Sequence, residues 1–175
     1  MSHGYITAVD DKLSWPVAHI DAVQIELSAW YTDHEEDGLI TAARENNVAI
    51  VAYSPLGKGV LTGAITDKSQ MTSAVMKDAP RFNEHWEHNK KLVDKFSSLA
   101  EKKGCSPGQL AIAWVSAQGA IPIPGTKSIG RLEENFGAGK VDLTQEELDS
   151  IRALIKDVGT TGDRYAPVHM AMIGN

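Results

Sequence analysis

The stretch Val48-Ala-Ile-Val-Ala-Tyr-Ser-Pro-Leu-Gly-Lys-Gly-Val-Leu-Thr-Gly63 decides the fold class of this chain. Its first five residues form a continuous apolar run, which is typical of a parallel strand buried on both faces. The run ends before Pro55, which has no N–H to donate to a neighbouring strand. The glycines that follow provide a loop whose backbone can approach a ligand closely. A loop at the carboxyl end of a parallel strand is the usual place for a binding site in α/β proteins.

The composition is that of a globular protein and excludes several classes of function. The chain has 175 residues, of which 42% are hydrophobic and 23% are charged. Its net charge of −6 argues against binding to nucleic acid or to an anionic membrane surface. No apolar run approaches the roughly 18 residues needed to span a bilayer, and residues 1–11 lack the pattern of a secretory signal. A single cysteine, Cys105, fits a reducing compartment, so we expect a cytoplasmic protein.

Upstream of the central stretch, the sequence predicts a strand and a helix. Residues 22–27 have the pattern of a short strand. Asp33 followed by Glu36 resembles a capping box, from which a helix continues to about residue 47. Residues 1–16 show no period and are expected to be irregular.

Downstream, the sequence predicts a long loop and then mostly helices. Residues 64–85 have no clear periodicity, which is typical of a functional loop. Capping boxes and apolar periodicity then predict four helices around one brief strand. The expected helices cover about 84–103, 107–117, 128–136 and 144–157, the strand covers 121–125, and the tail 158–175 is expected to be loop-like.

This alternation of strands and helices predicts a parallel sheet with right-handed crossovers. Only three strands are visible, however. A free three-stranded parallel sheet leaves both edges and much apolar surface uncovered. The sequence therefore predicts a unit that is incomplete or that leans on a partner.

Two segments are compatible with nucleotide binding, and each also has an ordinary explanation. The glycine loop has the spacing Gly-x-Gly-x-x-x-Gly, which is not the Rossmann fingerprint and also suits a simple strand-to-loop turn. Lys127 and Arg131 lie four residues apart near the start of a helix, where both can reach one phosphate. The same helix is also explained as a solvated helix with an Arg131–Glu134 ion pair.

Three segments, taken together, resemble the aldo-keto reductase family of NADPH-dependent carbonyl reductases. They occur in the family's order and spacing, and the pyridoxal-reductase-like branch is the most similar. The resemblance covers residues 17–157 and implies a partial TIM (β/α)8 barrel, approximately strands six to eight with their helices. The segments are Val23–Trp30, Ile50–Gly63 and Ile121–Phe136.

The resemblance implies roles for the first two segments at the nicotinamide and pyrophosphate. Gln24 lies where the family hydrogen-bonds the nicotinamide carboxamide, and an amide side chain suits that neutral group. Tyr53 lies where an aromatic ring stacks under the nicotinamide. The pyrophosphate loop matches a further set of residues, namely Ser54, Leu56, Gly57, Lys58 and Gly59.

For the third segment, the resemblance implies contacts with the adenosine end of the cofactor. Lys127 and Arg131 would bind the 2′-phosphate and so favour NADPH over NADH. Glu134 and Asn135 would bind the adenine edge. The full set at this end is Gly125, Thr126, Lys127, Arg131, Glu134 and Asn135.

The family's catalytic tyrosine, aspartate, lysine and histidine have no matching positions in this sequence. The resemblance therefore implies a C-terminal half of a reductase for small-molecule aldehydes or ketones, which binds NADP(H) but lacks the catalytic tetrad. A non-catalytic nucleotide-binding or subunit-like module, or a truncated product without activity alone, is the alternative. An isolated chain would expose its barrel edges, so association through them is expected.

Overall fold

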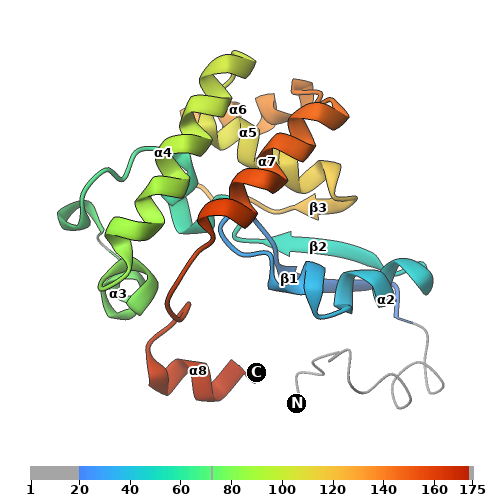
Figure 1. Ribbon diagram of the computed structural model, residues 1–175. Coiled ribbons are helices and arrows are strands. Elements are labelled where there is room, and N and C mark those ends of the chain that lie inside the picture. Colours follow the sequence, from blue (N-terminus) through green and yellow to red (C-terminus); the bar gives the residue numbers. More distant parts are fainter. Residues whose placement is uncertain (1–19, 72, 174–175) are drawn as a thin grey trace.

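The computed structural model describes residues 20–71 and 73–173 and shows a parallel sheet with helices gathered against it (Figure 1). The sheet has the order β1-β2-β3, with β1 at Ala22–Glu26, β2 at Ala49–Tyr53 and β3 at Ala120–Pro122. In its register Gln24 lies opposite Val51, which lies opposite Ile121. The predicted parallel sheet of three strands is confirmed for the described part of the chain.

The sheet is buried on one face only, so the prediction that β2 is buried on both faces is wrong. Ile50 is 3% exposed and Ala52 is fully buried, whereas Ala49 is exposed and Val51 and Tyr53 are half-buried. Successive strand residues point to opposite faces. The described helices cover the face of Ile50 and Ala52, which leaves the opposite face open along most of its length.

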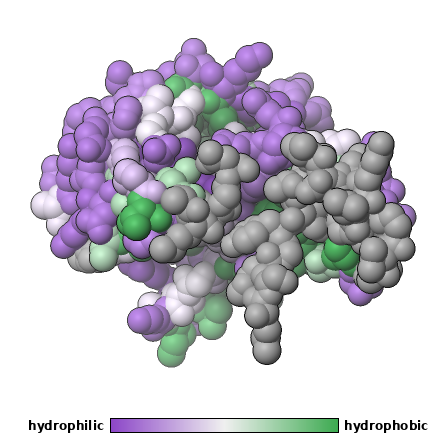
Figure 2. All heavy atoms as spheres, turned by 90° about the horizontal axis from the view of Figure 1, so that it is seen from below, coloured by the Kyte–Doolittle hydropathy of each residue, from purple (hydrophilic) through white to green (hydrophobic). Residues whose placement is uncertain are grey.

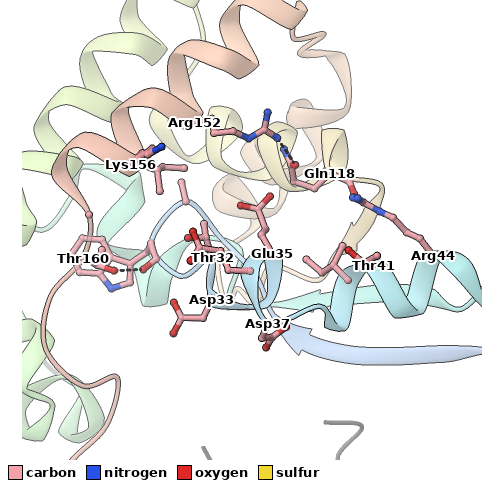
Figure 3. A pocket seen from close by; sticks show the side chains of 16 residues that line it. Thr32, Asp33, Glu35, Asp37, Thr41, Arg44, Gln118, Arg152, Lys156 and Thr160 are labelled. Atoms are coloured by element: carbon pink, nitrogen blue, oxygen red, sulfur yellow. Dashed lines mark hydrogen bonds between the residues drawn. The ribbon is translucent and has the colours of Figure 1, made fainter. Parts of the chain in front are cut away.

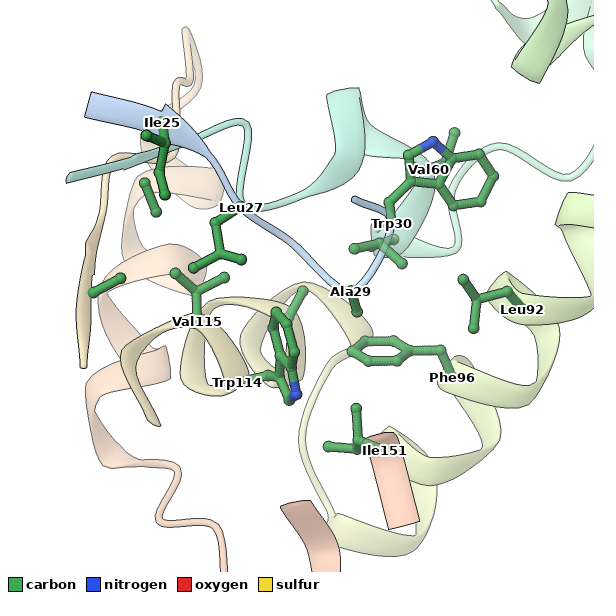
Figure 4. Packing of buried hydrophobic residues seen from close by; sticks show 14 of the residues in the cluster. Ile25, Leu27, Ala29, Trp30, Val60, Leu92, Phe96, Trp114, Val115 and Ile151 are labelled. Carbon is green, nitrogen blue, oxygen red and sulfur yellow. The ribbon is translucent and has the colours of Figure 1, made fainter. Parts of the chain in front are cut away.

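The hydrophobic core lies between the covered face and three long helices (Figure 4). These helices are α4 (Trp86–Lys103), α5 (Pro107–Ala117) and α7 (Gln145–Val158). Phe96 of α4, Trp114 of α5 and Ile151 of α7 are each at most 2% exposed and point toward one another. Burial of such large side chains stabilises the fold by about 2–3 kcal/mol each.

Local capping signals fix most of these helix ends. The predicted capping boxes form at Ser106 with Gln109 and at Thr144 with Glu147. Gly104 ends α4 in the left-handed conformation, with a φ of 74°. The capping box predicted at Asp33 does not form.

Thr32 takes the N-cap position instead, and the expected single helix is two helices. These are α1 (Asp33–Glu36) and α2 (Leu39–Glu45). Gly38, with a φ of 87°, interrupts them, and the Asp37 carboxylate accepts a hydrogen bond from the Leu39 N–H.

The region 64–85 is more structured than predicted. It contains three short helices, and Met71, Met76 and Phe82 are buried, because these side chains fill the space beside α4. The sequence did not predict these helices, because each is less than two turns long and is too short to show a periodic spacing of apolar residues. The helices are η3 (Lys68–Gln70), α3 (Ala74–Asp78) and η4 (Pro80–Phe82).

The C-terminal part also departs from the expected loop-like tail. After α6 (Ile129–Gly137), η5 (Ala138–Lys140) and α7, the chain continues past the sheet to α8 (Pro167–Ile173), which lies below the sheet in Figure 1. The irregular segment expected at 1–16 lies outside the described residues. No helix in the described ranges is long and apolar enough to cross a bilayer.

Where the described residues are visible from below, the surface is largely hydrophilic with a few hydrophobic patches (Figure 2). Helix α6 carries a separate exposed apolar row, in which Ile129 is 78% exposed and Phe136 is 82% exposed. Its residues are spaced for one face of a helix. This row and the open face of the sheet are two apolar surfaces that the described residues leave uncovered.

Candidate functional site

The carboxyl ends of β1 and β2 bring the first candidate residues together. Glu26 and Tyr53 are register partners at the last residue of each strand, and Gln24 lies two residues before Glu26. The three therefore share the open face of the sheet. Gln24 is exposed, so its amide is accessible, whereas Tyr53 is half-buried.

The loop after β2 is held in a rare backbone conformation. Ser54, Gly57, Lys58 and Gly59 have φ values of 54°, 55°, 57° and 97°, all in the left-handed region. Lys58 and Ser54 are not glycines, so they carry a conformational cost of about 1 kcal/mol each. Such strain persists where the surrounding structure determines the loop, as it often does at binding sites.

Hydrogen bonds and close packing fix this loop. The N–H of Gly57 donates to the Ser54 carbonyl at 2.9 Å, and the N–H groups of Gly59 and Leu61 both donate to the Leu56 carbonyl. A β-carbon at Gly57 would lie only 2.9 Å from the Trp30 β-carbon. Gly57 is therefore required both by its backbone angle and by the indole beside it.

A buried carboxylate organises the charges beside the loop. Glu26 is 2% exposed and accepts a hydrogen bond from the Arg164 guanidinium at 3.0 Å. The Lys58 ammonium lies 3.7 Å from the other Glu26 oxygen. Two cations beside one carboxylate offset the cost of burying its charge.

Aromatic rings surround the same cations. The Lys58 ammonium lies 4.3 Å from the centroid of Tyr165, and the Arg164 guanidinium lies 4.1 Å from that of Tyr31. Burial raises the pKa of Tyr53, and the charge of Glu26 and a hydrogen bond with Tyr165 raise it further. The Tyr53 phenol therefore stays neutral at physiological pH.

The environment of Tyr31 makes the stability of the chain sensitive to alkaline pH. Burial, opposed by the charge of Arg164, raises the pKa of Tyr31 to about 12 from an ordinary value of 10.0. A pKa that is higher in the folded state gives stability that is present below pH ~10 and is lost as pH rises toward the folded pKa. We expect Tyr31→Phe to remove about 1 kcal/mol of this alkaline loss between about pH 8 and about pH 11, because the latter lies midway between the unfolded and folded pKa values.

Urea unfolding of the wild type and Tyr31→Phe at about pH 8 and about pH 11 measures the difference. The free energy of unfolding of the wild type should fall more between the two pH values than that of the variant. Equal falls in both proteins would contradict the assigned environment of Tyr31.

The predicted adenosine-end residues lie at and before α6. Thr126 stabilises the entry to this helix, because its hydroxyl accepts a hydrogen bond from the Ser128 N–H at 3.1 Å. Gly125, Lys127 and Arg131 are exposed, and Asn135 is half-buried. No Arg131–Glu134 ion pair forms within the described residues, so the ordinary explanation of this helix does not hold in that form.

Glu134 has a different partner. Its carboxylate accepts a hydrogen bond from the Ser106 hydroxyl at 2.5 Å, at the start of α5. The Glu134 side chain also lies near the glycine loop. A β-carbon placed on Gly108 would lie 3.6 Å from Glu134 Oε1 and 3.8 Å from Leu56 Cδ2. Glu134 and Leu56 thus both have a side-chain atom near Gly108, and both Lys127 and Arg131 are exposed.

Sequence reasoning missed the residues that organise the strand ends. Glu26 lies two residues after Gln24, so the period of a strand was enough to place both on one face. Tyr31 and Arg81 gave no comparable signal. Arg81 is 7% exposed and donates to the carbonyls of Gly162 and Trp30, contacts that join segments far apart in the sequence.

A separate polar groove of about 980 Å³ lies between α1, α2 and α7 (Figure 3). Glu35 and Arg152 approach each other across it, and Arg44 donates to the Gln118 carbonyl. Burial raises the pKa of Glu35, while Arg152 and Arg44 lower it. None of the residues predicted to bind a cofactor lines this groove.

Comparison with known proteins gives a consistent family assignment. The Aldo/keto reductase family matches residues 4–156. An aldo-keto reductase of Gibberella moniliformis is 43% identical over 162 residues, which cover 90% of this chain and 50% of the relative. The Schizosaccharomyces pombe protein "Aldo-keto reductase yakc [NADP(+)]" is 42% identical over 154 residues, 85% of this chain and 45% of the relative.

Solved structures share the fold. The glycerol dehydrogenase AKR11B4 of Gluconobacter oxydans superposes with a TM-score of 0.69 at 25% identity, covering 83% of this chain and 45% of that chain. The thermostable aldo-keto reductase Tm1743, in complex with the inhibitor epalrestat, gives 0.56 at 24% identity, covering 76% and 39%.

The parallel sheet, its helical crossovers and the glycine loop define an α/β protein with its candidate site at the carboxyl edge of the sheet. The chain belongs to the aldo/keto reductase family. It spans about half the length of the curated relatives that it matches.

Proposed function

We propose that this chain forms barrel strands six to eight of an NADP(H)-dependent carbonyl reductase and carries most of its cofactor contacts. The observation that carries the proposal is the meeting of Gln24, Tyr53 and the left-handed loop 54–59 at the carboxyl ends of β1 and β2. Family membership and a relative whose name includes NADP(+) support the choice of cofactor.

The nicotinamide end of the cofactor fits the open face of the sheet. Tyr53 offers the face of a half-buried phenol, and because its pKa is raised it is a weak acid, which suits stacking better than proton donation. The exposed amide of Gln24 pairs with a carboxamide as both donor and acceptor. When bound, NADPH supplies a hydride to the carbonyl carbon of the substrate.

The phosphates fit the glycine loop and the start of α6. In the glycine loop, Gly57 and Gly59 allow the backbone to approach a pyrophosphate closely, because neither carries a side chain. Lys127 and Arg131 are exposed near the N-terminal turn of α6, where the helix dipole also favours an anion. Two cations at this position suit the doubly charged 2′-phosphate of NADP(H).

A proton donor for the carbonyl oxygen is not among the residues we assign. In this proposal it comes from strands that pair with the edges of β1 and β3, which the described residues leave unpaired. A second candidate, a nucleotide-binding module without turnover of its own, is favoured by the sheet face that the described helices leave open. The two differ in whether aldehyde reduction accompanies NADPH binding.

Arg131→Ala tests the cofactor assignment. We expect the Kd for NADPH to rise about tenfold to a hundredfold, because one charge-assisted contact to the 2′-phosphate is lost. The Kd for NADH should change by less than about twofold. Quenching of tryptophan fluorescence on titration with each cofactor measures both constants.

Arg152→Ala is the matched control, because Arg152 is an exposed arginine on α7, away from α6. It should leave both constants unchanged. Equal weakening of NADPH and NADH by Arg131→Ala would contradict the 2′-phosphate role, and no binding of either cofactor to the wild type would contradict the proposed function.

A further inference from the structure

Hydrogen bonds from the first turn of α5 converge on Glu134 of α6. The Ser106 hydroxyl donates to Glu134 Oε1 at 2.5 Å, and the side-chain amide of Gln109 donates to the Glu134 carbonyl at 3.2 Å. Helix α5 therefore holds this residue twice, once by its carboxylate and once by its backbone. The two donors lie 28 and 25 residues before Glu134 in the sequence.

The capping box of α5 fixes the direction of the Ser106 hydroxyl. Its oxygen accepts a hydrogen bond from the Gln109 N–H at 3.2 Å, while Gln109 Oε1 accepts one from the Ser106 N–H at 3.1 Å. A hydroxyl has one proton, and a backbone N–H can only donate. The proton of Ser106 is therefore left for the carboxylate, so this one residue both caps α5 and orients a side chain of α6.

A glycine on α6 allows the two helices to make these bonds. A β-carbon on Gly137 would lie 2.6 Å from Gln109 Nε2, the atom that donates to the Glu134 carbonyl. Any larger residue at 137 would push this amide away. The contact between the start of α5 and Glu134 thus depends on small residues as well as on the donors themselves.

The Glu134 carboxylate keeps one oxygen for another donor. Ser106 occupies Oε1, and none of the described residues donates to Oε2. A carboxylate accepts hydrogen bonds and donates none, so Oε2 suits an N–H group of a ligand. Glu134 is exposed, which makes that oxygen accessible.

The surroundings of Glu134 suit the base of a dinucleotide. Arg131, which we assign to the 2′-phosphate, lies three residues earlier and so on the same side of α6. Around Gly108, Glu134 meets apolar groups of the segment after β2, because a β-carbon there would lie 3.7 Å from Thr62 Cγ2 and 3.8 Å from Leu56 Cδ2. Apolar walls with one placed polar group are typical of a small-molecule site.

We propose that Ser106 is a positioning residue for the adenine of NADP(H). Its hydroxyl holds the Glu134 carboxylate in the orientation in which the second oxygen accepts a hydrogen bond from the 6-amino group of the base. This inference rests on the proposed function and concerns how the same site recognises the base. Without the hydroxyl, the glutamate side chain regains rotamer freedom, and ordering it again on binding weakens the contact.

The test compares NADP+ with its hypoxanthine analogue, in which a carbonyl oxygen replaces the 6-amino group. Titration calorimetry on the full chain gives a Kd for each dinucleotide without turnover. The wild type should bind NADP+ about tenfold tighter, because the analogue presents an acceptor to a carboxylate that needs a donor. Ser106→Ala should lower this ratio by about threefold or more.

Three further variants separate the hydroxyl proton from the helix cap. Ser106→Asp keeps a strong N-cap but has no proton to donate, so it should lose the preference as Ser106→Ala does. Ser106→Thr keeps both the cap and the hydroxyl and should keep the preference. Thr144→Ala is the matched control, because Thr144 caps α7 in a capping box of the same kind. It should destabilise the fold as loss of a cap does and leave the ratio unchanged.

The outcomes distinguish this inference from the proposed function. Equal affinities of the wild type for the two dinucleotides, or a full preference in Ser106→Ala, would overturn the inference alone. So would a preference restored by Ser106→Asp, because the cap and not the hydroxyl proton would then be responsible. A wild type that binds neither dinucleotide would overturn the proposed function and this inference with it.

Discussion

Glu26→Gln is expected to lower the free energy of unfolding of this chain by about 3 kcal/mol. The substitution keeps the size of the side chain but removes the negative charge that faces Arg164 and Lys58. Removal of one partner from a buried ion pair costs about 3–5 kcal/mol, because the remaining charge is left in a poorly solvated place. Urea unfolding followed by tryptophan fluorescence measures the loss.

A double-mutant cycle separates the pair from the glutamate itself. Glu26→Gln combined with Arg164→Gln should be more stable than the sum of the two single losses predicts, since the guanidinium that loses its carboxylate partner is then also removed. The exposed Glu87→Gln, on the first turn of α4, is the control and should change stability by less than about 0.5 kcal/mol. Additive losses in the cycle would show that Glu26 and Arg164 are not coupled.

Much of this fold follows from local sequence signals. The capping boxes at Ser106 and Thr144, the glycine at 104 and the apolar spacing of α4 each act within a few residues. Such signals are read correctly because the hydrogen bonds that they describe are local. The break at Gly38 was missed because the apolar pattern continues across it, although a glycine inside a helical pattern is itself a warning.

The errors concern what covers the sheet and what the tail does. An apolar run such as 48–52 indicates burial, but it does not say whether the chain itself supplies the covering layer. The path of the tail depends on Asn89 and Arg81, which bind Thr161 and Gly162 although they lie more than seventy residues away in the sequence. A periodic pattern of residues does not predict contacts between segments so far apart in the sequence.

The residues of the candidate site also differ in how far the sequence predicts them. The glycine loop was predictable because its own glycines indicate its backbone conformation, and the structure places it at the strand ends as expected. Its ionic partner Glu26 belongs to another strand, and Arg164 to the tail. A site formed by three separate segments is visible in the sequence only through the one segment that has an unusual composition.

Gly57→Ala is expected to lower the free energy of unfolding by about 3 kcal/mol. Its left-handed φ of 55° costs an alanine about 1 kcal/mol or more. The new methyl group would also lie 2.9 Å from the Trp30 β-carbon and 3.2 Å from a methyl of Val60, both of which are buried. Overpacking of this kind costs about 1–3 kcal/mol, since neighbours in a filled core cannot move freely.

Gly59→Ala is the matched control in the same loop. Its φ of 97° is also left-handed, but a β-carbon there would meet no atom within 4 Å. We therefore expect it to cost about 1–2 kcal/mol, from backbone strain alone. Urea unfolding of the two variants side by side measures the difference, which reports the packing of Trp30 against the loop. Equal losses would mean that the indole moves aside and that backbone conformation alone accounts for the glycine at 57.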